Sequence, residues 1–192
     1  MNTAIPCTEC TANCCGEFRI FITPFDLLRL SKALNVPAGK ICLPVQLCLE
    51  NADHRPSSFS LGEEERFLLA LRRRSDRCLF QMNVGGMRRC GVHAFRPLVC
   101  RSYPFIFDGR RLRTVRQFVC PTEWTLTPEE RVESISIGKR MSAENMQYEA
   151  LLETWHEVEL PRINREGIAS RAFRERFHRY LIFLENRCQL LR

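Results

Sequence analysis

Eight of the eleven cysteines in this 192-residue chain follow one ordered pattern, which restricts the fold more than any other feature of the sequence. The pattern starts with a cluster near the N-terminus and continues as four separate cysteines: Cys7, Cys10, Cys14, Cys15, Cys78, Cys90, Cys100 and Cys120. A Cys-x2-Cys pair lets one turn direct two thiolates at one ion, and further cysteines complete the soft ligand set that Zn²⁺ or an iron–sulfur cluster prefers. The pattern therefore predicts a polythiolate metal site with these eight residues as ligands.

The N-terminal residues and the hydrophobic pattern predict a cytoplasmic protein. Residues 1–7 contain neither a basic stretch nor the apolar segment of an export signal, and no apolar run approaches the roughly 20 residues that cross a bilayer. In a reducing compartment, clustered cysteines are metal ligands or catalysts more often than disulfides. We therefore expect a metal or cluster partner and no membrane.

The positive charge is confined to the cysteine-bearing part of the chain. Residues 1–126 contain 18 Arg and Lys against 11 Asp and Glu, whereas residues 127–192 contain 11 of each. A basic stripe is typical of nucleic-acid binding, but thiolates also need positive charge: eight around two Zn²⁺ carry about −4, and four around a 2+ iron–sulfur core carry about −2. Since the metal site accounts for part of the excess, we expect no specific nucleic-acid binding.

The first half of the chain predicts short, irregular elements. Phe18 to Ile22 reads as a strand, Thr23-Pro24 opens a helix that ends near Asn35, and a second helix is expected from Gly39 to Leu49. Residues 55–62 read as a loop. Residues 67–71 are expected to form a strand that turns into residues 78–82, a hairpin ended by Gly85-Gly86.

The second half predicts one further hairpin and then helices. Phe105 to Phe107 and Leu112 to Phe118 flank Asp108-Gly109, which suits a type I′ turn and would bring Cys120 back toward Cys100. Apolar residues then recur at three- and four-residue intervals in three segments: 129–137, 143–158 and 169–190. We therefore expect an α+β fold, with a small irregular cysteine-rich core at residues 1–126 and an α-helical extension at residues 127–192.

Residues near the cysteine pattern have two interpretations each. His93 could ligate the metal or serve as a structural hydrogen-bonding residue. Arg96 and Arg101 could donate N–H groups to thiolates or form exposed ion pairs, and Arg72-Arg73-Arg74 suits a solvated turn or a phosphate-binding patch. Three cysteines outside the pattern are expected in the core: Cys42, Cys48 and Cys188.

The cysteine motifs resemble those of the YkgJ-like cysteine-cluster family, described as a zinc- or iron-chelating domain. The resemblance runs from Cys7 to about Trp124 and is most specific at the ten-residue step from Cys90 to Cys100, which contains Arg96-Pro97. The family usually has two residues before the Cys-Cys pair where this chain has three, and a tyrosine where His93 stands. The resemblance implies metal binding. A related cluster occurs in flagellin lysine N-methylases, which are longer chains that resemble S-adenosylmethionine-dependent enzymes with an iron–sulfur centre.

Three functions remain open from the sequence. We favour a metal-binding protein whose site is structural or redox-active, with an iron–sulfur cluster favoured over zinc because adjacent Cys14-Cys15 suits a polynuclear cluster. The alternatives are a cluster-containing methyltransferase-like enzyme acting on a protein substrate, and a zinc-dependent nucleic-acid module. No nucleotide-binding glycine motif and no hydrolase nucleophile elbow is present, so the catalytic residues stay unknown.

Overall fold

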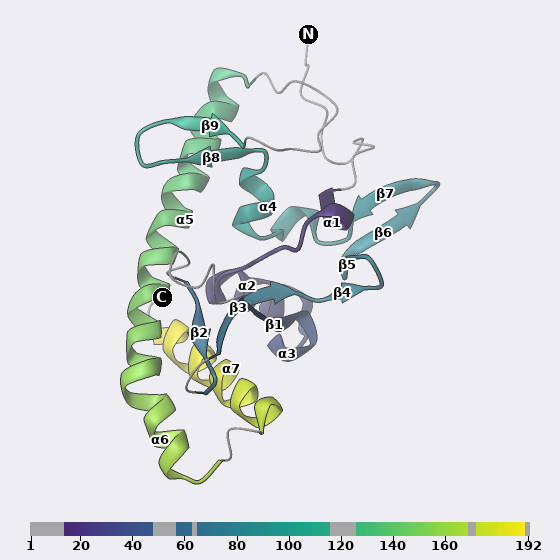
Figure 1. Cartoon of the computed structure of the whole chain (residues 1–192). Helices are drawn as coiled ribbons and strands as arrows, with labels where there is room; N and C mark the ends of the chain where they lie inside the picture. Colours follow the sequence, from purple (N-terminus) through teal and green to yellow (C-terminus); the bar gives the residue numbers. More distant parts are fainter. Residues whose placement is uncertain (1–13, 48–56, 63–64, 116–125, 169–171, 191–192) are drawn as a thin grey trace. The chain divides into compact units, whose positions relative to one another are not determined.

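A computed structural model describes residues 14–47, 57–62, 65–115, 126–168 and 172–190 (Figure 1). Helices and small antiparallel hairpins alternate along the chain, which confirms the expected α+β class. The chain forms two compact units: residues 1–20 with 71–143, and residues 21–70 with 144–192. The domain division between residues 126 and 127 stays a prediction. No helix in the described part of the chain is long and apolar enough to cross a membrane.

The first unit consists of short helices and three hairpins. Its helices before α5 (Pro128–Thr154) are α1 (Cys14–Glu17), the 3₁₀-helix η2 (His93–Phe95) and α4 (Leu98–Ser102). Its strands pair as β4 (Arg73–Arg74) with β5 (Arg77–Cys78), β6 (Gln81–Val84) with β7 (Met87–Cys90), and β8 (Phe105–Phe107) with β9 (Leu112–Thr114).

The turns of these hairpins differ from the expected ones. Gly85 and Gly86 have φ angles of 59° and 78° and connect the paired residues Val84 and Met87, as a two-residue type I′ turn requires. They therefore form the turn of a separate hairpin and do not end the preceding one. The type I′ turn expected at Asp108-Gly109 is wrong, because only the glycine has a positive φ and the Asp108 carboxylate instead accepts hydrogen bonds from the backbone N–H groups of Arg110 and Arg111.

Helix α2 (Pro24–Leu34) of the second unit begins and ends as predicted. Thr23 is the N-cap and accepts a hydrogen bond from the N–H of Asp26, and Asn35 ends the helix in the left-handed conformation at φ 53°. The expected strand from Phe18 to Ile22 is wrong: among the described residues it reduces to an isolated bridge between Phe21 and Ala70.

A three-stranded sheet follows this helix, with strand order β1-β3-β2. The helix expected from Gly39 to Leu49 is wrong, because α3 (Ala38–Ile41) covers one turn and β1 (Cys42–Gln46) continues as a strand. The loop expected at residues 55–62 contains β2 (Phe59–Ser60), which pairs with β3 (Arg66–Leu71). Sheet pairing overrides local preference here, since strand formation depends on the partner strand.

The C-terminal helices include one long helix and one π-helical turn. Helix α5 (Pro128–Thr154) is continuous, so the expected interruption between residues 137 and 143 is wrong. The π-helix η3 (Trp155–Glu159), α6 (Leu160–Arg165) and α7 (Phe173–Leu190) follow. Pro161 lacks an N–H, and a proline ring in a helix clashes with the carbonyl four residues earlier. The preceding Leu160 N–H donates a hydrogen bond to the carbonyl of Trp155, five residues back, which is the π-helical pattern.

Aromatic side chains form the core of the second unit. Phe59 stacks on Tyr180 with ring centroids 4.1 Å apart, and Trp155 meets Tyr180 edge-on at 4.8 Å. Two neighbouring residues of η3 bind the backbone of Ser60. Trp155 Nε1 donates a hydrogen bond to the Ser60 carbonyl at 2.8 Å, and the Ser60 N–H donates one to His156 Nε2 at 3.0 Å. Cys42 and Cys188 are buried, as expected, whereas Cys48 lies outside the described residues.

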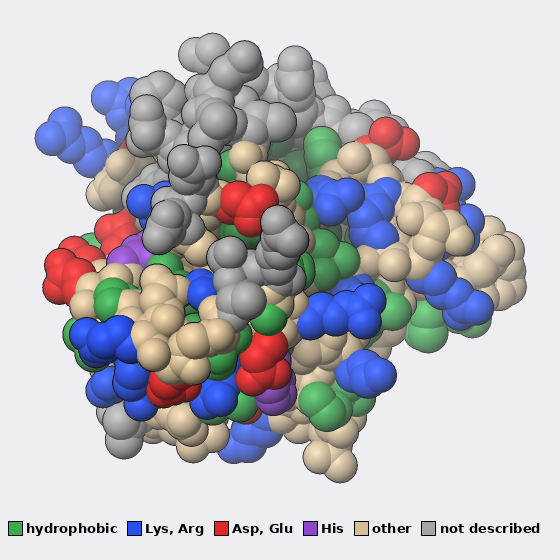
Figure 2. All heavy atoms as spheres, turned by 60° about the horizontal axis from the view of Figure 1, so that its bottom comes forward, with side chains coloured by type: hydrophobic (Ala, Val, Ile, Leu, Met, Phe, Trp, Pro, Cys, Tyr) green, Lys and Arg blue, Asp and Glu red, His purple; other side chains and the backbone are tan. Residues whose placement is uncertain are grey.

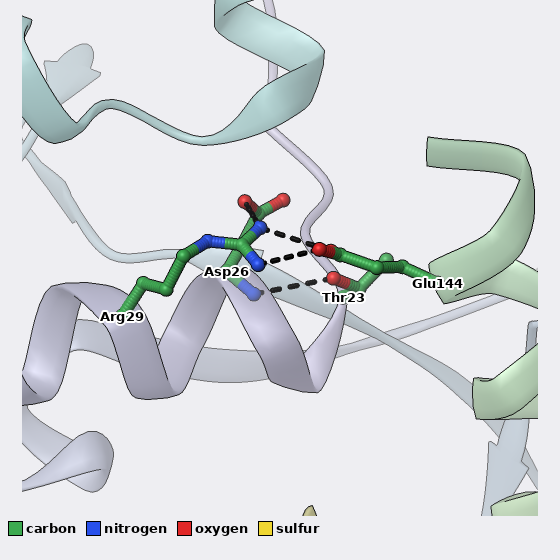
Figure 3. A network of polar contacts seen from close by, with 4 residues as sticks. All are labelled: Thr23, Asp26, Arg29 and Glu144. Atoms are coloured by element: carbon green, nitrogen blue, oxygen red, sulfur yellow. Dashed lines mark hydrogen bonds and ion pairs between the residues drawn. The ribbon is translucent and has the colours of Figure 1, made fainter. Parts of the chain in front are cut away.

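A buried charge network joins α2 to the C-terminal part of α5 within the second unit (Figure 3). The Arg29 guanidinium donates to the Glu144 carboxylate at 2.6 and 2.9 Å and also to Asp26. Asp26 and Glu144 are only 3% and 8% exposed. Because two carboxylates are withdrawn from water here, loss of the arginine between them would leave buried charge uncompensated and destabilise this unit.

Candidate metal centre

The adjacent cysteines Cys14 and Cys15 occupy the first turn of α1 and are half-buried. In a strand, neighbouring side chains point to opposite faces, whereas in a helix they are separated by only about 100° around the axis. The helical turn therefore lets both thiols face the same region, and their side chains hydrogen-bond to each other.

The packing of α1 brings this pair to Cys78. Helix α1 contacts β5, and Cys78 is the last residue of β5, with 7% of its surface exposed. Burial raises the pKa of Cys78, which the N–H of Phe80 partly offsets, and the charges of Cys90 and Cys14 raise the pKa further. The N-terminal pair and Cys78 are thus within electrostatic reach of one another.

Cys90 and Cys100 belong to the same group of thiols. Cys90 ends β7 and Cys100 lies in α4, and both are half-buried. The pKa of Cys15 is raised, first by its hydrogen bond to Cys14, then by burial, and then by the negative charges of Cys14, Cys78 and Cys100. Five of the eight predicted ligands therefore influence one another's ionisation: Cys14, Cys15, Cys78, Cys90 and Cys100.

One thiol of this group ionises near neutral pH. The hydrogen bond from Cys15 lowers the pKa of Cys14 to about 7 against the opposing effect of burial, and the Cys15 backbone N–H and the positive charge of Arg96 lower it further. Each additional thiolate would repel the first, so the group resists full ionisation without a cation. A metal ion or a cationic cluster removes that repulsion, and the donor set fits such a group.

Arg96 and His93 lie beside the cysteines. Arg96 Nη1 is 2.8 Å from His93 Nε2, and burial followed by the Arg96 charge lowers the pKa of His93, so the neutral imidazole accepts this hydrogen bond. Arg96 thus stands within electrostatic reach of Cys14, as its interpretation as a thiolate partner requires. Arg101 instead pairs with Glu133 at 3.2 Å, which confirms the ion-pair interpretation for that residue.

Sequence reasoning missed the position of Arg73. Its side chain donates hydrogen bonds to the carbonyl oxygens of Gly16 at 2.6 Å and Phe18 at 2.9 Å, at the end of the helix that carries Cys14 and Cys15. The interpretation of Arg72-Arg73-Arg74 as a solvated turn is wrong for Arg73, although Arg74 is exposed. The hairpin register decides this, and an arginine run contains no signal of it.

The complete ligand set extends beyond the described part of the structure. Cys7, Cys10 and Cys120 lie outside the described residues, as does Trp124. Among the residues that are described, no three Cys, His, Asp or Glu side chains are close enough together to hold a metal ion by themselves. The structure thus brings five cysteines into one electrostatic group, and the eight-residue ligand set stays a prediction.

Comparison with known proteins gives the same type of site. No curated protein and no solved structure matches the chain. A family model matches residues 6–125, and its description is "CxxCxxCC: Putative zinc- or iron-chelating domain". The matched segment covers well over half of the chain and spans all eight cysteines of the pattern. The chain therefore belongs to the CxxCxxCC family of zinc- or iron-chelating domains.

Proposed function

We propose that this protein binds an iron–sulfur cluster through its patterned cysteines and that the cluster has a structural or redox role. The mutual influence of the five described thiols, with Cys14 ionising near neutral pH, is the observation that carries the proposal. Thiolate is the ligand that iron–sulfur clusters and structural zinc share. The family match supports chelation of iron or zinc, and the choice of iron is our own inference.

The geometry of the Cys14-Cys15 pair favours a polynuclear centre. Two adjacent residues in a helical turn place their sulfurs in one region, and two iron atoms of a cluster can each take one thiolate. A tetrahedral zinc site closes with four thiolates, so eight cysteines would correspond to two zinc ions. The described thiols form one electrostatic group, which fits one polynuclear centre more simply.

Two arginines would support the loaded site. Arg96 supplies positive charge near Cys14, and Arg73 holds the carbonyls that follow Cys15. A bound cluster would supply either one-electron chemistry or a cross-link between distant segments. The protein's own residues would set the charge and polarity around the sulfurs, which are the main determinants of a cluster's reduction potential.

Anaerobic purification from iron-supplied cells tests the metal identity. We expect iron and acid-labile sulfide in the isolated protein, together with the broad visible absorption of iron–thiolate centres. Cys78→Ser and Cys100→Ser are expected to lose most of the iron, because each removes one predicted ligand. A colourless protein with stoichiometric zinc would replace iron by zinc in this proposal.

Two cysteines outside the pattern provide matched controls. Cys42 and Cys188 are buried in the second unit, and neither belongs to the predicted ligand set. Cys42→Ala and Cys188→Ala are expected to keep the iron content of the unmodified protein. Equal iron loss in these variants and in Cys100→Ser would contradict the ligand assignment.

The remaining functional expectations follow from this site. We propose a cytoplasmic location, because thiolate centres of this kind persist in a reducing compartment. We also expect only weak, salt-sensitive binding to nucleic acid. Submicromolar, sequence-dependent affinity of the loaded protein for duplex DNA or single-stranded RNA would instead favour the zinc-dependent nucleic-acid module.

A further inference from the structure

Hairpin β6–β7 has two chemically different faces. Val84 pairs with Met87, Met82 with Arg89, Asn83 with Arg88, and Gln81 with Cys90. Because directly opposed residues share a face and successive residues alternate, one face carries Met82, Val84, Met87 and Arg89. The other carries Gln81, Asn83, Arg88 and Cys90. We call the first set the apolar face of the hairpin.

The hydrophobic side chains of the apolar face are open to solvent. Met82, Val84 and Met87 are 49%, 53% and 50% exposed. The hairpin projects beyond α1 and α4 of its own unit (Figure 1), and it pairs with no third strand in the described part of the chain. Single exposed apolar side chains are common on protein surfaces, but contiguous groups of them mark interaction surfaces.

The surroundings of the apolar face are strongly basic. Arg89 Nη2 lies 3.7 Å from the Met87 sulfur, and Arg88 is exposed on the opposite face. The preceding hairpin and its flanks expose three further arginines: Arg72, Arg74 and Arg77. Asp76 is the only acidic residue from position 72 to position 90, and it pairs with Arg77 at 3.4 Å.

The charge of the whole unit points the same way. Residues 1–20 and 71–143 contain 16 Arg and Lys and 8 Asp and Glu, a net +8, whereas the second unit contains 13 and 14, a net −1. At the right-hand edge of Figure 2, on the side of hairpin β6–β7 in Figure 1, basic and hydrophobic side chains lie side by side. A partner that covers this surface must therefore combine apolar and acidic groups.

We propose that the apolar face of hairpin β6–β7 docks a partner protein whose contact surface presents apolar side chains surrounded by carboxylates. Methionine side chains adapt to varied apolar shapes, and the arginines around them fit carboxylates in a bidentate geometry. The proposal is independent of which metal the protein binds. The docking surface is also distinct from the predicted metal ligand of this hairpin, because Cys90 belongs to its opposite face.

Two other anionic partners fit this surface less well. Single-stranded nucleic acid binds through aromatic side chains on which bases stack, and the apolar face has none. Segments that lie in a membrane interface carry Trp, Phe or Leu on their apolar face, and the apolar face of this hairpin carries none of these residues. The exposed apolar groups lie along the face, which suits the flat surface of a protein.

Two synthetic peptides test the proposal on the full-length, metal-loaded protein. One alternates leucine with glutamate, the other alternates leucine with lysine, and both carry a fluorophore for anisotropy titration. We expect saturable binding of the glutamate peptide and binding of the lysine peptide at least about tenfold weaker. The triple variant Met82→Thr, Val84→Thr and Met87→Thr keeps β-forming residues and is expected to weaken binding of the glutamate peptide about tenfold.

A matched control introduces the same residue on the other face. Asn83→Thr is expected to leave both titrations unchanged, and Arg88→Gln with Arg89→Gln is expected to reduce the preference for the glutamate peptide. The proposal would be overturned by equal affinity for both peptides, by unchanged affinity of the triple variant for the glutamate peptide, or by the absence of saturable binding. Binding to anionic phosphatidylglycerol vesicles or duplex DNA would overturn it if that binding were stronger than peptide binding and were lost in the triple variant. Self-association in sedimentation equilibrium that the triple variant abolishes would also overturn it.

Discussion

Arg73 lies directly opposite Cys78 on the β4–β5 ladder, and its guanidinium donates hydrogen bonds to the carbonyl oxygens of Gly16 and Phe18. One side chain thereby connects the strand that carries Cys78 to the segment that follows Cys14 and Cys15. Hydrogen bonds from a charged donor are among the stronger ones in proteins, so this contact positions two predicted ligand segments against each other.

Arg73→Ala is therefore expected to lower metal content and to destabilise the first unit. Each lost hydrogen bond from the charged donor contributes about 1.5–3 kcal/mol to the free energy of unfolding. Metal analysis and thermal unfolding measure the two effects. Arg74→Ala, at the exposed neighbour, is the control and is expected to change neither. An unchanged metal content in Arg73→Ala would refute the positioning role.

Removal of the metal is expected to unfold the first unit, residues 1–20 and 71–143, which contains all eight predicted ligands. Structural thiolate sites contribute about 10–16 kcal/mol in small zinc domains, which is comparable with or above the roughly 5–15 kcal/mol net stability of a domain. Thermal unfolding before and after anaerobic chelation is the measurement, and Cys100→Ser is expected to show the chelated behaviour without chelator. If the stripped protein keeps its original transition, the metal is not structural.

Gly138 lets helix α5 pass close to Phe107 within the first unit. A Cβ built at Gly138 would lie 2.2 Å from the Cβ of Phe107, so one of the two backbones must move in Gly138→Ala. The variant is expected to be destabilised by about 1–3 kcal/mol in chemical denaturation, although alanine favours helix by about 1 kcal/mol.

Two further variants separate this steric conflict from helix propensity. Phe107→Gly removes the Cβ that the added methyl group would meet, together with the ring, and in that background the additional cost of Gly138→Ala is expected to shrink. Gly39→Ala in α3 meets only Leu181 at 3.4 Å and is expected to be nearly neutral. A stabilising Gly138→Ala would show that α5 and Phe107 are not as close as the structure places them.

Arg29 forms ion pairs with two buried carboxylates in the second unit. Arg29→Met is expected to destabilise the protein by about 3–5 kcal/mol, because Asp26 and Glu144 would remain buried without their shared guanidinium. Urea unfolding measures the loss. The double variant Arg29→Met with Glu144→Gln removes one of the two charges and is expected to recover part of it; no recovery would exclude charge as the cause.

His156 makes the stability of the second unit depend on pH. Burial and then the nearby Arg66 charge lower the pKa of His156 below its ordinary value of 6.5, and its neutral Nε2 accepts a hydrogen bond from the Ser60 N–H. The unfolded chain takes up the proton more readily, so stability is full above about pH 6.5, falls as the pH drops below it, and levels off below the native pKa.

Urea titrations at about pH 7.5 and about pH 5.5, on either side of the ordinary histidine pKa, measure this loss. His156→Gln retains an acceptor and is expected to lose less stability between the two pH values than the unmodified protein. His178→Gln, at an exposed position of α7, is the control and is expected to keep the original pH dependence. Identical pH dependence in all three proteins would remove His156 from this account.

The sequence by itself determined the kind of site and several local structures. Cysteine spacing predicted metal chelation, which the family match supports. Thr23 and Asn35 predicted both ends of α2 because caps act within a few residues. The hairpin of β8 and β9 was predicted from its alternating residues, although its turn was not.

Only the tertiary structure decided which distant groups meet. Residues 42–46 form a strand because β3 is available to pair with them. Helix α5 continues through Gly138, whose lack of a side chain leaves room for Phe107. Arg73 belongs to an arginine run that was expected to be solvated, but the β4–β5 register directs its side chain at the end of α1. Such contacts depend on strand register and packing between remote segments, which local propensity does not encode.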